Sequence, residues 1–188
     1  MVKQYALFAE EPAVPGLVLA ERVVTAAEEA ELAARVDAEP LAPFQYGPWQ
    51  AKRMTVHYGS RYDYTSRSVG PAPPFPSWLA RLRDRLAPLV GVEPTAIEQA
   101  LLIRYDPGAG IGWHRDRPHY EDVLSLSLSA PAVLKLRKRK GKKAFERREV
   151  MLQPRSIYRL SGDVRWEWEH SIDPMEVTRR SITFRTLR

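Results

Sequence analysis

A segment in which leucine and serine strictly alternate, DVLSLSLS at residues 122–129, constrains the fold of this chain more than any other feature. Because side chains alternate between the two faces of a β-strand, an extended segment points its leucines to one side and its serines to the other. The leucine face must meet a packed apolar layer, whereas the serine face meets something small and polar. We predict that this segment is a strand that forms one wall of a polar cavity.

From Glu98 onward the chain consists of short strand patterns separated by turn residues, at intervals of roughly 8–12 residues. Such spacing is typical of all-β sandwiches and barrels. The pattern occurs in seven segments: EQALLIRY (98–105), DVLSLSLS (122–129), AVLKLRKR (132–139), AFERREVMLQ (144–153), SIYRLSG (156–162), WEWEHSI (166–172) and RRSITFRTL (179–187).

Two helices are predicted before these strands. Residues 16–37 have the pattern of a short strand followed by a helix, with Thr25 and Glu28 at the spacing of a capping box. In residues 77–91, Ser77 suits an N-cap and is followed by leucines at helical spacing. Each helix therefore has one apolar face that can pack on a sheet.

The chain has 188 residues, of which 44% are hydrophobic, enough to bury one sizeable core. We predict one domain, 1–188, of mainly β structure with flanking helices (α+β). Residues 98–188 would form a jelly roll, and residues 1–97 would supply two helices packed on one of its sheets.

The chain contains no cysteine, which excludes a disulfide framework, a thiolate metal site and a cysteine nucleophile. Any protein-bound metal must then be held by His, Asp or Glu. The N-terminus lacks a secretory signal pattern, and no apolar run approaches the roughly 20 residues of a membrane span. We expect a cytoplasmic, monomeric protein with no membrane partner.

Positive charge is concentrated in one segment, residues 135–148, which holds nine Lys/Arg and one acid, Glu146, and so carries +8. The net charge of the whole chain is +6, so the remainder sums to −2. A basic hairpin of this kind either keeps an edge strand soluble or contacts phosphates, and composition does not separate the two.

Three side chains have the types and spacing of an iron site. His114 and Asp116 stand two apart, and His170 lies in the later segment WEWEHSI, where Trp166, Trp168 and His170 share a parity. Two histidines and one carboxylate form the facial triad that binds Fe(II) and leaves open positions. The His-x-Asp pair alone is better explained by a surface histidine hydrogen-bonded to a neighbouring acid.

The last strand pattern, RRSITFRTL, places Arg179 and Arg185 on the same face as Ser181, opposite an apolar face. Arginines inside a barrel are costly unless they meet anions. A dicarboxylate co-substrate would supply such anions and suits bidentate pairing with Arg. The alternative is a solvated arginine pair on the outer face.

Four motifs in order, RYDPGAGIGWHRD (104–116), SLSLS (125–129), WEHSI (168–172) and RRSITFR (179–185), resemble the AlkB-like family of Fe(II)/2-oxoglutarate dioxygenases. The clear match covers about residues 101–187. The resemblance implies a double-stranded β-helix fold and the use of Fe(II), 2-oxoglutarate and O₂.

It also implies individual roles. Fe(II) would be bound by His114, Asp116 and His170. The co-substrate would be contacted by Tyr105, by Arg179 at its distal carboxylate, by Arg185 nearer the metal, and by Ser181 on the same face. The implied reaction hydroxylates a C–H bond, and on an N-methylated nucleobase it releases formaldehyde.

The chain departs from the family pattern at three positions. Ile103 replaces an asparagine that contacts the co-substrate, Pro118 replaces an aspartate that contacts the base in some repair members, and Ser129 replaces a glycine. These departures leave iron and 2-oxoglutarate binding intact but put base recognition in question.

The expected substrate is an alkylated base in DNA or RNA, single-stranded or flipped out of a duplex. Phosphates would be contacted by the hairpin through Lys138, Lys140 and Lys142. A substrate lid would offer aromatic side chains to the base: Trp49, Tyr58, Tyr62 and Tyr64. The alternatives are the same chemistry on a protein side chain or small molecule, and a nucleic-acid-binding β-domain without iron.

Overall fold

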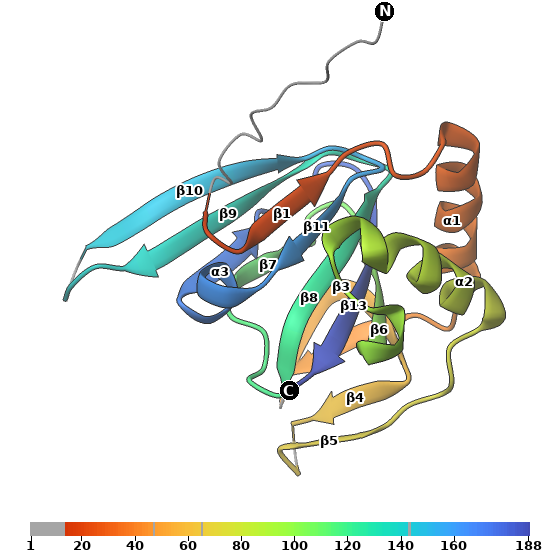
Figure 1. Ribbon diagram of the computed structural model, residues 1–188, viewed down its shortest axis with the longest axis horizontal. Coiled ribbons are helices and arrows are strands. Elements are labelled where there is room, and N and C mark those ends of the chain that lie inside the picture. Colours follow the sequence, from red (N-terminus) through yellow and green to blue (C-terminus); the bar gives the residue numbers. More distant parts are fainter. Residues whose placement is uncertain (1–13, 47, 65, 143) are drawn as a thin grey trace, which may run out of the picture.

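The computed structural model describes residues 14–46, 48–64, 66–142 and 144–188. Two facing antiparallel sheets form the barrel, two helices cover the outside of the larger sheet, and one hairpin projects away from the body (Figure 1). The predicted α+β jelly roll is therefore confirmed. Residues 1–13 of the predicted domain, and Lys143 in the basic hairpin, lie outside the described residues. No helix in the described part of the chain is long and apolar enough to cross a membrane.

The larger sheet has the strand order β1-β11-β8-β13-β6-β3-β2, the smaller one β10-β9-β12-β7, and β4 pairs with β5. The strands are β1 (Leu17–Ala20), β2 (Ala42–Tyr46), β3 (Trp49–Tyr58), β4 (Ser60–Asp63), β5 (Ser68–Pro71), β6 (Ile97–Tyr105), β7 (Ile111–His114), β8 (Tyr120–Leu128), β9 (Ala132–Arg139), β10 (Phe145–Leu152), β11 (Ile157–Leu160), β12 (Trp168–Ile172) and β13 (Arg179–Leu187). The helices are α1 (Ala26–Ala38), α2 (Ser77–Leu86) and α3 (Gly162–Trp166), with 3₁₀ turns at Ala87–Val90 and Pro94–Ala96.

The alternation in β8 works as predicted. Its leucines are buried with α1 and α2 in the core outside the larger sheet, as are Ile182 and Phe184 of β13. Ser125 and Ser127 point into the barrel, where Ser125 exchanges a hydrogen bond with Thr183 at 3.0 Å. Apolar packing and polar cavity thus lie on opposite faces of the same strands.

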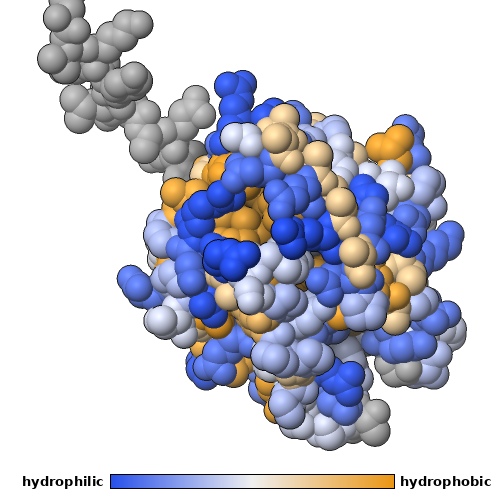
Figure 2. Space-filling model, turned by 90° about the vertical axis from the view of Figure 1, so that its right-hand side faces the viewer, coloured by the Kyte–Doolittle hydropathy of each residue, from blue (hydrophilic) through white to orange (hydrophobic). Residues whose placement is uncertain are grey.

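The two helices pack through the predicted side chains. Leu32 and Val36 of α1 and Leu79, Leu82 and Leu86 of α2 are buried against the larger sheet. The capping box of α1 forms in both directions between Thr25 and Glu28. Opposite these buried side chains, the face that the helices present outward is predominantly hydrophilic (Figure 2).

A second core fills the space between the two sheets. Leu134 and Leu136 of β9 and Trp168 of β12 are buried there with side chains of β10 and β11. Strands β9 and β10 continue past this core, so their far ends form the projecting basic hairpin (Figure 1). The hairpin is therefore exposed on both faces near its tip.

Three local predictions were wrong. Trp166 belongs to the short helix α3 and not to the strand of His170, because the chain turns helically after Gly162. Ser77 is the first residue of α2, and the N-cap is Pro76. Ser129 lies beyond the end of β8 with a φ of 75°, the left-handed region that favours glycine, so it does not share the inner face of Ser125.

Candidate metal centre and substrate cavity

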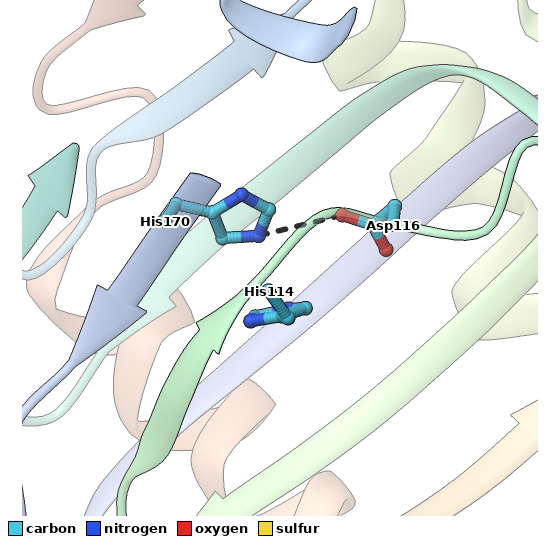
Figure 3. A group of neighbouring side chains, drawn as sticks. All are labelled: His114, Asp116 and His170. Atoms are coloured by element: carbon cyan, nitrogen blue, oxygen red, sulfur yellow. Dashed lines mark ion pairs between the residues drawn. The ribbon is translucent and has the colours of Figure 1, made fainter. Parts of the chain in front are cut away.

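The smaller sheet brings the two histidines together. His114 ends β7 and lies directly opposite His170 of β12 in the antiparallel register, with ring centroids 4.2 Å apart. Asp116 follows two residues later and places Oδ2 3.4 Å from His170 Nε2 (Figure 3). One ligand atom from each of the three residues lies within 4.8 Å of the others. To bind one ion with bonds of about 2.0–2.2 Å, the three ligand atoms need to lie somewhat closer together than this.

The protonation states of the three side chains suit a divalent metal. Burial lowers the pKa of His170 to about 3 and also lowers the pKa of His114, so both imidazoles are neutral at neutral pH. Burial alone would raise the pKa of Asp116, but the charge of the Arg185 guanidinium holds it well below its usual range. Two neutral imidazoles and one carboxylate form the donor set of a facial triad.

Each ligand is oriented by a neighbour. His114 Nδ1 lies 2.8 Å from the carbonyl oxygen of Gly112, which favours the tautomer that leaves Nε2 as the ligand atom. Arg185 Nη2 lies 2.6 Å from Asp116 Oδ1, and its Nη1 donates to Gln99 Oε1 at 2.6 Å. Gln99 is itself fixed, because its amide nitrogen donates to the Ser60 carbonyl at 2.9 Å. A buried chain of polar contacts thus positions the carboxylate ligand.

Arg179 is the one buried guanidinium of the described chain that has two unsatisfied nitrogens. Arg179 is 1% exposed, and its Nη2 donates to Ser127 Oγ at 3.0 Å. Its guanidinium carbon lies 5.3 Å from the centre of the Tyr105 ring. Its Nε and Nη1 have no hydrogen-bond partner. Ser181 is buried on the same face, opposite Ser127 and Ile103 in the register. Orphaned donors of this kind fit a carboxylate, so these residues fit the distal end of a dicarboxylate.

A cavity of about 450 Å³ opens above the metal ligands. His114 and Asp116 lie in its wall, and Tyr62 and Tyr64 lie at its mouth with Tyr46 of β2. The Arg117 guanidinium lies 4.7–5.6 Å from the centres of these three tyrosine rings. The exposed Trp49 and Trp113 also belong to the cavity wall. Apart from Tyr58, the lid aromatics named from the sequence therefore surround the cavity.

The prediction that Tyr58 faces the substrate is wrong. Tyr58 is buried in the core with the helices, where its hydroxyl bonds to the Glu39 carboxylate. In β3 the side chains alternate, so Arg53 and His57 face the cavity while Val56 and Tyr58 face the helices. The sequence did not reveal which parity pointed inward.

The basic hairpin carries partly neutralised lysines. Lys138 lies 3.8 Å from Glu167, and Lys140 lies 3.0 Å from Glu146. Lys142 is exposed near the tip. Arg137 of the hairpin contacts both an acid and aromatic rings. Its Nε donates to Glu169 Oε2 at 2.6 Å, and its guanidinium lies 4.4 Å from the Trp113 ring centre and 4.7 Å from that of Phe145. The stacking arginines were not singled out from the sequence, although alternation in β9 places Arg137 and Arg139 on one face.

Two other functional residues were missed. The sequence patterns identify neither Gln99, which lies within the strand pattern of 98–105, nor Arg117. A polar residue in the inward parity of an otherwise apolar strand is a signal that could have identified Gln99. Arg165 donates to the carbonyls of Arg117 and Tyr120.

Comparison with known proteins decides the family. The model of the 2OG-Fe(II) oxygenase superfamily matches residues 16–185, which include the three metal-ligand candidates together with Arg179 and Arg185 of β13. The chain belongs to the 2OG-Fe(II) oxygenase superfamily. Its cofactors are accordingly Fe(II), 2-oxoglutarate and O₂, and the enzyme is a dioxygenase.

Sequence relatives show that the oxygenase is AlkB-like. It is 29% identical over 182 residues to "Alkylated DNA repair protein ALKBH8 homolog" of Arabidopsis thaliana, covering 85% of this chain and 51% of the relative. It is 28% identical over 166 residues to "tRNA (carboxymethyluridine(34)-5-O)-methyltransferase ALKBH8" of Mus musculus, covering 85% of this chain and 24% of the relative. The oxygenase thus spans about half or a quarter of the length of these curated relatives.

Solved structures share the fold. OsALKBH1 superposes with a TM-score of 0.70 at 16% identity, covering 92% of this chain and 97% of that one. A Pseudomonas putida prolyl-4-hydroxylase superposes with a TM-score of 0.60 at 17% identity, covering 92% of each chain. At these identities the likeness concerns the double-stranded β-helix alone, which different substrates can share.

Proposed function

We propose that this dioxygenase oxidatively demethylates alkylated nucleobases in DNA or RNA. The observation that carries the proposal is the ring of aromatic side chains around the metal-site cavity. The Tyr64 ring makes edge-to-face contacts with Tyr46 and with Tyr62, each with ring centroids 5.0 Å apart. Such rings can hold an unstacked base, since stacking on aromatic side chains contributes about 1–3 kcal/mol per base.

A second feature extends from the cavity along the smaller sheet. Trp113 precedes the metal-ligand candidate His114, and the Arg137 guanidinium contacts the rings of both Trp113 and Phe145. The Arg139 guanidinium lies 4.7 Å from the centre of the same Phe145 ring. Alternating guanidinium groups and aromatic rings are suited to the phosphates and bases of a single strand. We propose that the basic hairpin, residues 135–148, holds the strand whose base enters the cavity.

The names of the curated relatives agree with a nucleic-acid substrate. One is called an alkylated DNA repair protein homolog, and the other a methyltransferase of carboxymethyluridine 34 in tRNA. Both names refer to nucleic acid. Because this chain spans only part of each relative, the names support a nucleic-acid substrate without choosing between DNA and RNA.

Different residues would bind the metal, bind 2-oxoglutarate and line the cavity. His114, Asp116 and His170 would hold Fe(II), and Arg179, with Tyr105 beside it, would hold the distal carboxylate of 2-oxoglutarate. When bound, these groups convert O₂ and 2-oxoglutarate to succinate and CO₂ while a C–H bond of the substrate is hydroxylated. A hydroxylated N-methyl group then breaks down to the free base nitrogen and formaldehyde. Leu101, Ile103 and Ile111 line the cavity and limit the entry of water.

The test is aerobic turnover with Fe(II) and 2-oxoglutarate on methylated single-stranded DNA, methylated duplex DNA and tRNA, with succinate and formaldehyde measured together. Formaldehyde in step with succinate on one polymer is the expected result. Succinate without formaldehyde on any of them would contradict the proposal. It would favour the alternative, oxidation of a protein side chain or small molecule by the same metal centre.

A further inference from the structure

We propose that the cavity selects a substrate ring that is neutral and carries or adjoins an anionic oxygen group, bound by Arg53, and that it disfavours alkylated bases with a fixed positive charge. The anionic group could be a carboxylate on the ring or the phosphate of the same nucleotide. This inference rests on the proposed function in taking the ring to be a nucleobase. It goes further by stating the charge of the part that enters the cavity.

The cavity wall is strongly positive. It contains four arginines, Arg53, Arg115, Arg117 and Arg185, and one acid, Asp116. Asp116 is already paired with Arg185 at 2.6 Å. Bound Fe(II) and 2-oxoglutarate carry opposite charges of equal size, so loading the site leaves this excess unchanged. The other three arginines therefore face the substrate space without a carboxylate partner among the described residues.

Arg53 is the arginine of this set placed for specific recognition. It extends from the cavity face of β3 and is partly buried, and its guanidinium lies 4.2 Å from the centre of the Phe44 ring. In the described part of the chain it forms no ion pair and no hydrogen bond. Stacking on Phe44 fixes the plane of the guanidinium but leaves its N–H edges free. Those edges can pair with a carboxylate or phosphate in bidentate fashion.

The other arginines differ from Arg53. Arg115 is exposed at the mouth, where solvent screens its charge. Arg117 is enclosed by the three tyrosines of the rim, and Arg185 is held by Asp116 and Gln99. Arg53 is thus the partly buried guanidinium of the wall that keeps its donors free for a ligand.

Burial, and to a smaller extent the nearby arginines, disfavours positive charge on a side chain of the cavity wall. His57 lies four residues beyond Arg53 on the same face, and its pKa is lowered to about 4 by burial and then by Arg185, Arg61 and Arg53. A group in this cavity therefore resists acquiring a positive charge. A ring with a fixed positive charge would meet the same opposition, whereas a neutral ring with an anionic group would be favoured.

The test measures binding by calorimetry to the Fe(II)- and 2-oxoglutarate-saturated protein without O₂. The ligands are uridine, uridine 5′-monophosphate, 5-carboxymethyluridine, N6-methyladenosine and cationic 1-methyladenosine. Benzoate and benzamide form a further pair that does not depend on nucleotide recognition. We expect the anionic uridines to bind about tenfold to a hundredfold more tightly than uridine. Which of the two binds more tightly identifies the carboxylate or the phosphate as the partner of Arg53.

Three variants separate the possible roles. Arg53→Gln should bring the anionic and neutral uridines to within about threefold of each other, and Arg53→Lys should keep part of the preference. Arg81→Gln, at an exposed position of α2 outside both the cavity wall and the hairpin, is the matched control and should leave nucleoside binding unchanged. The affinity for 2-oxoglutarate should be the same in all three.

Several results would overturn the inference. They are equal affinity for uridine and its anionic forms, binding of 1-methyladenosine as tight as that of N6-methyladenosine, and weaker 2-oxoglutarate binding in Arg53→Gln with the anion preference intact. If no nucleoside binds but benzoate exceeds benzamide and loses its advantage in Arg53→Gln, the nucleic-acid function fails while the anion site stands. Binding of neither benzoate nor any nucleoside rejects both.

Discussion

The deep end of the active site and its rim are held by different kinds of interaction. At the deep end, Asp116, Arg185 and Gln99 form a buried series of ion pairs and hydrogen bonds, and Arg179 is almost completely enclosed. At the rim, Arg117 stacks among tyrosines, and the hairpin arginines stack on Phe145 beside solvent. Buried, hydrogen-bonded groups hold one geometry, whereas exposed stacking interactions are individually weak and easily exchanged.

This difference allows one metal and co-substrate geometry to be combined with different substrate-binding side chains. Iron and 2-oxoglutarate chemistry needs ligands in one geometry, and the two sheets supply it through strand register, as in the opposition of His114 and His170. The side chains that would meet the substrate come from β2, β3, β4, β7, the loop before β8 and the hairpin, and several of them, such as Tyr46, Trp49 and Trp113, are exposed. Substitutions at the two regions should therefore affect different measured quantities.

The largest effect is expected from His170→Ala, which removes a buried ligand of the metal centre. We expect Fe(II) retention after desalting to be lost and succinate formation to fall to background, because two ligands cannot hold the ion in place. Metal analysis and succinate assays measure this. Retention of stoichiometric Fe(II) by the folded variant would show that His170 is not a ligand.

Arg179→Met should raise the KM for 2-oxoglutarate by about 10- to 100-fold, since a charge-assisted pair contributes about 1.5–3 kcal/mol. Without 2-oxoglutarate the variant should be no less stable than the wild type, because the substitution removes a buried cation with two unsatisfied nitrogens. Thermal unfolding provides this control. An unchanged KM would place the distal carboxylate elsewhere.

Gln99→Leu should weaken Fe(II) binding by about tenfold, as is typical when a residue that orients a metal ligand is removed. The reason is that Arg185 would no longer donate to Oε1 and would hold Asp116 less firmly. Gln99→Glu keeps the acceptor and is the matched variant, expected to recover most of the affinity. Equal Fe(II) affinity in wild type and Gln99→Leu would mean that Arg185 needs no support.

The smallest effect is expected at the hairpin. The double variant Arg137→Gln/Arg139→Gln should weaken binding of a single-stranded oligonucleotide and reduce the slope of log affinity against log salt by about 0.7 for each phosphate that the protein no longer neutralises. The KM for 2-oxoglutarate should not change. A salt slope equal to that of the wild type would remove the hairpin from the nucleic-acid surface.

The deep end was more accessible to sequence reasoning than the rim. The period of two in 122–129 and 179–187 predicts which side chains enter the barrel, because a strand allows only two faces. The same rule misplaced Tyr58, since a strand without an evident apolar face does not reveal which parity points inward. Gln99 contacts Arg185, which is distant in sequence, and Arg117 contacts three tyrosines that come together only in the folded chain. Such partnerships depend on packing between strands that no local pattern encodes.

The most direct test of the division between chemistry and selection is the rim variant Tyr62→Ala/Tyr64→Ala, assayed for succinate and formaldehyde in the same reactions. Substrate-free turnover of 2-oxoglutarate should stay within about twofold of the wild type, while formaldehyde from a methylated oligonucleotide should fall about tenfold or more. Tyr58→Phe, which changes a buried tyrosine outside the cavity, should leave the ratio of the two products unchanged. A parallel loss of substrate-free succinate and formaldehyde in the folded rim variant would contradict the account.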